Sequence, residues 1–498
     1  MRIILLFLNI AVAVNLIHGS FVNPYPKFKS FSDGGDPGEA LYLTKYIENG
    51  EVEKARNLAL VNHPEMTIIN YAGYFTVNKE YNSNMFFWFF PAKVNTDNAP
   101  VVLWLQGGPG ASSLFGLFTE NGPYSISSND ESNLQQNTFR GLFKLFAKNG
   151  PSGSKPKLIP RKYSWHLNHN LIYIDNPVGT GFSFTDADDG YAKNEKDVGE
   201  NLLRALQQFF LLFPNLQKNE FFVSGESYAG KYVPAIGYAI YQDSKREDNE
   251  PQKPKINLKG LAIGNGLTDP IHQFNYGDYL YQLGLIDSNG HEQFLQYQNQ
   301  GIDCIKNRDF DCAFDVFDKL LNADQYPQGS LFKNLTGFNM YFNYLKTDDN
   351  SGNAMGDFLQ KTETRHSIHV GNNTFHGLEG ENKVEDHLKR DVMNSVADWV
   401  AELLSHYPIL VYNGQLDIIV AYPLTENYLK NLNFSGAEEY KTAKRYIWRV
   451  DNELAGYVKH AGNLTEVLVR NAGHMAPGDQ PKWVLDMLLR FTHHKGFQ

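Results

Sequence analysis

Three polar residues, Ser227, Asp417 and His474, have the types and the chain order needed for nucleophilic catalysis by a serine. Ser227 lies in FFVSGESYAGKYVP (221–234), which predicts a strand, a sharp turn and the start of a helix. Such a nucleophile elbow lifts a serine hydroxyl clear of the sheet. The alternative is an ordinary strand-to-helix turn, because Gly-x-Ser occurs four times and Ala229 stands where the strict pattern has Gly.

A base and an acid for this serine follow it along the chain. Asp417 comes just past a strand predicted at 408–413, and His474 just past one predicted at 466–470. Each alone is a weak signal, because most Asp are solvated charges and most His are structural. Together they have the order acid then His, each after a strand, that α/β-hydrolases use.

A glycine-rich turn, QGGPG (106–110), follows an apolar strand predicted at 101–105. Glycine lets a backbone amide approach a ligand closely, so this turn can donate to an oxyanion, with the amide of Tyr228 as the other donor. The alternative is a turn that needs glycine only for positive φ.

Strands alternate with helices over most of the chain, which predicts a mostly parallel sheet flanked by helices. Strands are expected at 73–77, 85–90, 101–105, 171–175, 221–224, 258–264, 408–413 and 466–470, with a helix at 194–214. This rhythm stops between 271 and 399, where we expect a mainly helical insertion over the sheet. The core is then discontinuous, formed by 20–270 and 400–498.

The chain start is typical of a secretory signal peptide, expected at 1–19, with a signal anchor as the alternative. No later segment reaches spanning length, so we expect no stable membrane anchor. A secreted or lysosomal protein follows. The net charge of −10 disfavours a nucleic-acid partner.

Two further sequence features, the glycosylation motifs and the cysteines, are interpreted on the expectation that the chain enters the secretory pathway. Four Asn-x-Ser/Thr sites become candidate glycan sites: Asn334, Asn372, Asn433 and Asn463. The only cysteines, Cys304 and Cys312, are expected to form a disulfide, with two free thiols as the alternative. Two cysteines with no nearby His cannot form a zinc site by themselves.

One stretch, 141–160, has four lysines and no acidic residue within an acidic protein. It is an atypical basic insertion in the core. It is interpreted as a loop without function or a gene-model artefact, with a functional basic surface loop as the alternative.

The chain resembles the serine carboxypeptidase family from about Gly73 to its C-terminus, with 141–160 excluded, and most of all its vitellogenic-like and insect venom members. Six blocks carry this resemblance: WLQGGPGASS, IDNPVGTGFSF, SGESYAGKYVP, GNGLTDP, YNGQLDIIV and NAGHMAPGDQP. It implies an α/β-hydrolase fold with a cap insertion. It also implies a triad of Ser227, Asp417 and His474, with oxyanion donors at Gly108 and Tyr228.

The resemblance further implies how a free C-terminus is recognised. The positions that match the family's carboxylate-binding set are Gln106, Gly107, Glu120 and Glu226. Two carboxyls brought together cannot both ionise cheaply, so one stays protonated and can donate to a substrate carboxylate. Best activity at acidic pH is therefore expected. Many members have Asn at Gln106 and Cys at Ala111, and most have several disulfides, so this cap must be held by packing.

The leading hypothesis is an exopeptidase that removes C-terminal residues from peptides or proteins through an acyl-enzyme, without a metal or organic cofactor. An acyltransferase or esterase on the same fold is the first alternative. A catalytically silent secreted protein is the second. Side-chain preference at the scissile bond is not predicted, and a homodimer is an open alternative to a monomer.

Overall fold

The computed structural model describes residues 34–127, 157–247, 253–323, 328–348, 354–376 and 383–497. The expected signal peptide and residues 141–156 of the basic stretch lie outside these residues.

A ten-stranded sheet forms the centre of the molecule. Its strand order is β1 (Tyr71–Asn78), β2 (Ser83–Phe90), β6 (Asn170–Ile174), β3 (Val101–Leu105), β7 (Phe221–Glu226), β8 (Leu258–Gly264), β9 (Ile409–Gly414), β12 (Leu464–Val469), β11 (Glu453–Ala461) and β10 (Tyr446–Val450). The strands from β6 to β12 in this order are parallel, and the strands at both edges are antiparallel. The predicted parallel sheet is therefore confirmed at the centre, between antiparallel edges.

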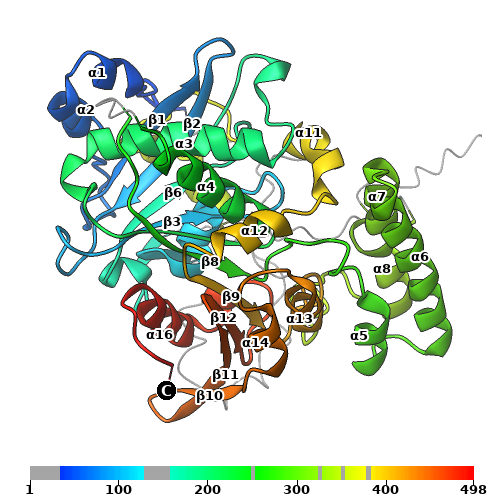
Figure 1. The fold of residues 1–498 in the computed structure, drawn as a ribbon. Coiled ribbons are helices and arrows are strands. Elements are labelled where there is room, and N and C mark those ends of the chain that lie inside the picture. Colours follow the sequence, from blue (N-terminus) through cyan, green and yellow to red (C-terminus); the bar gives the residue numbers. More distant parts are fainter. Residues whose placement is uncertain are drawn as a thin grey trace, which may run out of the picture.

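Helices cover both faces of this sheet (Figure 1). On one face α3 (Glu195–Leu212) packs along α4 (Ala229–Ser244), with α12 (Ala397–Leu403) beside α4. On the other face lies α16 (Pro481–Thr492). The shorter core helices are α1 (Thr44–Glu48), α2 (Val52–Leu58), α13 (Tyr422–Asn431), α14 (Ala437–Thr442) and α15 (Ala476–Asp479), with a π-helix at Gly116–Asn121 and 3-10 turns at Trp165–Leu167, Asp188–Gly190 and Pro214–Leu216.

Side chains of the central strands alternate between two hydrophobic cores. In β3, Val101, Leu103 and Leu105 belong to the core under α3 and α4. Val102 and Trp104 belong to the core under α16. Because both faces are covered, the strand reads as a continuous apolar run in the sequence.

The region between β8 and α12 is mainly helical where the structure describes it. Its helices are α5 (Tyr276–Gln282), α6 (Ser288–Lys306), α7 (Phe310–Phe317), α8 (Leu331–Thr336), α9 (Ala354–Leu359), α10 (Thr362–Ser367) and α11 (Lys383–Val392), with a π-helical turn at Asp318–Asn322. Helices α5 to α8 stand to the side of the sheet in Figure 1. The expected disulfide between Cys304 and Cys312 is present and joins α6 to α7.

The basic stretch contributes to the fold at its end. Lys157–Pro160 form β5, which pairs antiparallel with β4 (Tyr124–Ser127). The Leu158 amide also donates to a Glu65 carboxylate oxygen at 3.0 Å. These last residues are therefore integrated in the fold.

No helix within the described ranges combines the length and the apolar character that crossing a membrane would require.

The aromatic packing of α3 against the edge of the sheet can be tested at Phe209. This fully buried side chain meets the rings of Phe87, Phe89 and Phe213 at centroid distances of 6.2, 5.0 and 4.9 Å. We expect Phe209→Ala to lower the free energy of unfolding by about 3–5 kcal/mol, because it leaves a cavity in the core. Chemical denaturation measures this, and Tyr281→Ala, at a half-exposed ring, should change it by less than about 1 kcal/mol.

Candidate active site

Ser227 occupies a strained turn between β7 and α4. Its φ is +65°, a left-handed conformation that is uncommon for a residue with a side chain. Its amide donates to the Gly264 carbonyl at 3.1 Å, which ties the turn to the end of β8. Ser227 is partly exposed, whereas Glu226 and Tyr228 on either side are buried. The turn has the backbone of a nucleophile elbow.

The glycine turn after β3 lies directly against this elbow. A Cβ at Gly107 would overlap the Tyr228 nitrogen and the Glu226 oxygen, so only glycine fits there. Gly108 has φ +113°, which also favours glycine. The amides of Gly108 and Tyr228 therefore belong to two chain segments in contact, as an oxyanion site requires.

Asp175, which the sequence analysis did not single out, supports this turn. Its carboxyl accepts hydrogen bonds from Ser112 Oγ at 2.5 Å and from the Ser113 amide at 3.1 Å. It also accepts from the Phe182 amide at 2.8 Å. The IDNPVGTGFSF segment is thereby fastened to the residues that follow the glycine turn, and burial raises the pKa of Asp175 to about 7.

His474 and Asp417 meet after the adjacent parallel strands β12 and β9. His474 Nδ1 lies 2.8 Å from Asp417 Oδ2, and both side chains have no exposed surface. His474 Nε2 is buried and has no hydrogen-bond partner among the described residues. The imidazole is thus held through one nitrogen, and the other is left to accept a proton.

Donors from the backbone and from Asn265 hold the Asp417 carboxyl. Asn265 Nδ2 donates to Asp417 Oδ2 at 2.7 Å, and its Oδ1 accepts from the Gly414 amide at 3.0 Å. The amides of Ile419 and Val420 donate at 3.1 and 3.3 Å. Asn265 lies in the GNGLTDP block, but nothing local in that block points to a partner 152 residues later.

The helical insertion also contacts the loops that contain Asp417 and His474. The Tyr341 carbonyl accepts from the amides of Ile418 and Ile419, each at 3.2 Å. The Phe342 carbonyl accepts from the His474 amide at 2.7 Å, and the two rings lie 5.1 Å apart. The segment at 341–344 was given no role from the sequence, and it positions the loops that carry the acid and the base.

Gln106, Glu120 and Glu226 form a second buried polar group beside the elbow. Gln106 Nε2 donates to Glu226 Oε1 at 3.0 Å, and Gln106 Oε1 accepts from Trp104 Nε1 at 3.0 Å. Glu120 and Glu226 are almost fully buried. Over the part of the chain described, neither Glu120 oxygen has a hydrogen-bond partner of ordinary geometry, and Glu226 Oε2 has none either.

Burial controls the proton of this carboxyl pair. It raises the pKa of Glu120 to about 7, and hydrogen bonding to Glu226 opposes the rise. Burial and the charge of Glu120 together raise the pKa of Glu226 well above its usual value. The pair therefore keeps at least one proton in acid, and that proton can be donated to an anion.

The four candidate glycan asparagines all lie at the surface. The Asn463 side chain differs from the rest, because its Nδ2 donates to the Leu404 carbonyl at 2.9 Å.

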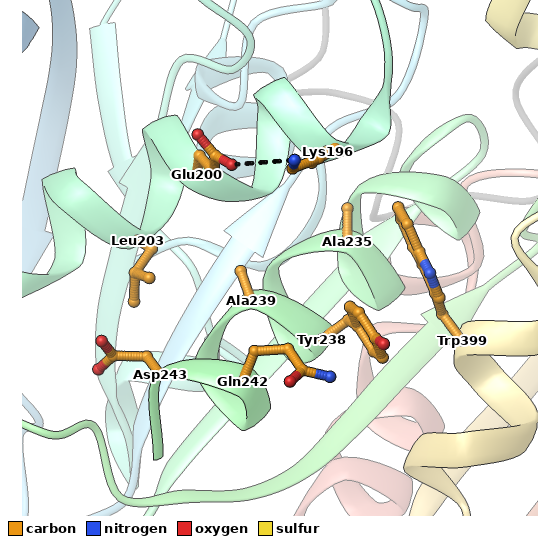
Figure 2. Close-up of a pocket in the computed structure, with 9 residues that line it drawn as sticks. All are labelled: Lys196, Glu200, Leu203, Ala235, Tyr238, Ala239, Gln242, Asp243 and Trp399. Atoms are coloured by element: carbon orange, nitrogen blue, oxygen red, sulfur yellow. Dashed lines mark ion pairs between the residues drawn. The ribbon is translucent and has the colours of Figure 1, made fainter. Parts of the chain in front are cut away.

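A groove of about 370 Å³ lies away from these residues, between α3, α4 and α12 (Figure 2). Ala235 and Ala239 line it, and the rings of Tyr238 and Trp399 stack at its end, 5.2 Å apart. It shares no residue with the predicted catalytic set. No group of three or more His, Cys, Asp or Glu side chains within the residues described here is arranged to hold a metal ion.

A parallel central sheet flanked by helices, with an elbow serine and an acid–histidine pair after its strands, defines an α/β-hydrolase. The fold is similar to that of a solved structure of KEX1(delta)p, a prohormone-processing carboxypeptidase from Saccharomyces cerevisiae. The TM-score is 0.69 at 22% identity, covering 88% of this chain and 96% of the other.

The chain belongs to the serine carboxypeptidase family, whose model matches residues 61–494. It is 55% identical to the venom serine carboxypeptidase of Apis mellifera, over 96% of each chain. It is 50% identical to the vitellogenic carboxypeptidase of Aedes aegypti, over 95% of this chain and 94% of the relative. The protein is a serine carboxypeptidase, and the predicted family is confirmed.

The contact between Asn265 and Asp417 should matter for turnover. We expect Asn265→Ala to lower kcat about 10-fold, because a hydrogen bond to a charged group contributes about 1.5–3 kcal/mol. Steady-state kinetics on a blocked dipeptide measures this, and Asn431→Ala, at an exposed position on α13, is the control. An unchanged kcat in Asn265→Ala would show that the backbone donors suffice for Asp417.

Proposed function

We propose that Ser227, His474 and Asp417 carry out the peptide cleavage through an acyl-enzyme. His474 Nε2 takes the proton of the Ser227 hydroxyl as this attacks the last peptide carbonyl. The protonated imidazole then gives the proton to the leaving amino acid, and water repeats the cycle on the ester. Asp417 orients the ring and stabilises its charged form. Two observations support this proposal: the 2.8 Å contact between Asp417 and His474, and the elbow conformation of Ser227.

The oxyanion that forms in this attack is assigned to the backbone amides of Gly108 and Tyr228. The close approach of Gly107 to the elbow supports the assignment, because it brings the two segments together. Such donors are arranged before the reaction and need no reorganisation.

The substrate's terminal carboxylate is assigned to Gln106, Gly107, Glu120 and Glu226. Support comes from the two buried carboxyls, because both Glu120 oxygens and Glu226 Oε2 lack partners of ordinary geometry within the described chain. A protonated carboxyl donates to a carboxylate, whereas an ionised one repels it. This selects free chain ends and favours activity in acid.

The remaining expectations agree with an acidic secretory destination. We propose removal of the signal peptide at 1–19 and glycans at Asn334, Asn372 and Asn433, whose side chains are exposed. Asn463 is the weakest of the four sites, because its amide is engaged by Leu404. The helical region at 271–399 is proposed as a cap that forms the side-chain pockets.

The nucleophile can be tested with a fluorophosphonate probe. We expect the wild-type protein to be labelled on Ser227 and to lose peptidase activity in proportion, because only an activated serine reacts. Ser227→Ala should remain folded, resist labelling and retain less than about one part in 1,000 of kcat. Release of single amino acids from peptides by purified Ser227→Ala would contradict the mechanism.

The carboxylate assignment can be tested by comparing a blocked dipeptide acid with its C-terminal amide. We expect kcat/KM for the acid to exceed that for the amide by about 100-fold at pH 5, since hydrogen-bonding sites reject ligands that leave buried groups unpaired. Mass spectrometry of the products measures both rates. Equal rates would instead favour an esterase or acyltransferase role.

The pH dependence follows from the buried carboxyl pair. The raised pKa of Glu120, about 7, means that this carboxyl is protonated in acid and becomes an anion, which repels the substrate carboxylate, as pH rises through neutrality. We expect KM for the dipeptide acid to rise above about pH 7, with a smaller change in kcat. Glu120→Gln, which cannot ionise at this position, should flatten that rise. A flat wild-type profile between about pH 4 and 8 would overturn this assignment.

A further inference from the structure

Lys231 is a buried charged residue that the mechanism above does not use. It comes four residues after Ser227, in the first turn of α4, and its side chain has no exposed surface. Its Nζ donates to the carbonyl oxygens of Asp391, Val392 and Asn394, the last at 2.8 Å. It also pairs with the Asp391 carboxylate at 3.0 Å.

These acceptors lie at the C-terminal end of α11. A helix leaves its last carbonyls unsatisfied there and presents the negative end of its dipole. The Lys231 ammonium donates hydrogen bonds to these carbonyls and places a positive charge at the negative end of the dipole. The helix end in turn offsets the high free-energy cost of burying that charge. One amino group therefore joins the insertion to the first turn of the helix that follows the nucleophile.

The same amino group faces the side chain of the proposed oxyanion donor. Lys231 Nζ lies 5.4 Å from the centroid of the Tyr228 ring, which also meets the Tyr232 ring at 5.1 Å. Glu195, at the start of α3, completes this cluster. Burial raises the pKa of Glu195 to about 8, and the charge of Lys231 opposes the rise.

A chain of hydrogen bonds connects the same two regions by a second route. The Leu267 amide donates to the Ser227 carbonyl at 3.0 Å, and Thr268 Oγ1 donates to the Gly230 carbonyl at 3.0 Å. The Val396 amide then donates to the Thr268 carbonyl at 3.1 Å. The segment at 391–396 is thus attached to the elbow both through Lys231 and through Thr268.

Farther along α4, toward its C-terminal end, the helix borders a groove. Tyr238 and Ala239 face the groove shared with α3 and Trp399 (Figure 2). The buried contacts of Lys231 lie instead at the N-terminal end of α4, where a shift of the helix would move the Tyr228 amide.

We propose that Lys231 is a positioning residue for catalysis. By fastening the end of α11 to the first turn of α4, it fixes the Ser227 hydroxyl and the Tyr228 amide relative to His474. The inference rests on the proposed role of Ser227. The competing explanation is that Lys231 contributes only to the stability of the fold.

Lys231→Met tests the inference, because methionine retains an unbranched side chain and removes the charge and its donors. We expect kcat on the blocked dipeptide to fall about 30-fold with KM within about 3-fold, since a misplacement of about 1 Å can cost 100-fold in rate. The second-order rate of fluorophosphonate labelling should fall with kcat. Asp391→Asn keeps the three carbonyl acceptors of Lys231, so a smaller fall in kcat, about 3-fold, is expected.

Leu488→Ala is the matched control, because this buried residue of α16 lies in the core on the opposite face of the sheet. It should lower the melting temperature and leave kcat and labelling unchanged. Folded Lys231→Met with wild-type kcat and labelling rate would overturn the proposal and leave Lys231 a stability role. If Lys231→Met does not fold, the same criterion applies to Asp391→Asn. Labelling of wild type but not of Ser227→Ala establishes the nucleophile separately.

Discussion

The buried carboxyl of Asp417 needs hydrogen-bond donors, and the rest of the proposed catalytic site is arranged to supply them. It has no exposed surface, so its oxygens need donors from the protein. Those donors come from Asn265 after β8, from the loop after β9, and from His474 after β12. Because neighbouring parallel strands end at the same edge of the sheet, one carboxyl can hold three loops together. The orientation of the His474 imidazole therefore depends on the segments that follow all three strands, β8, β9 and β12.

The carboxyls of Glu120 and Glu226 are also buried, but they have far fewer hydrogen-bond donors than Asp417. Asp417 receives a set of donors, whereas Glu120 is buried with no partner of ordinary geometry in the described chain. The protonated form is favoured for Glu120 and Glu226 because burial raises the pKa of both. Two kinds of carboxyl chemistry thus coexist beside one serine, and the difference lies in the donors that surround each group.

The sequence predicted what depends on short stretches of chain. The central strands are short, mostly apolar runs, and Ser227, Asp417 and His474 each follow soon after such a run. The edge strand β10 and its neighbour β11 escaped detection, because half-exposed strands such as YIWRV and ELAGYVKHA mix charged and apolar residues. Asn265 and Asp175 could not be assigned a role either, because their partners are distant in the chain and only the fold brings them together.

The insertion shows most clearly why local patterns were insufficient. It was expected only as a mainly helical insertion over the sheet, yet it also contacts the loops that contain Asp417 and His474, through groups that carry little sequence information. Tyr276 and Tyr279 donate their hydroxyls to the carbonyls of Ile419 and Asp417, each at 2.8 Å. The contacts at 341–344 include main-chain hydrogen bonds. Main-chain contacts persist when side chains change, so pocket residues can vary while the acid and the base stay in place. A helical insertion with one disulfide can in this way remain fixed where it contacts Asp417 and His474.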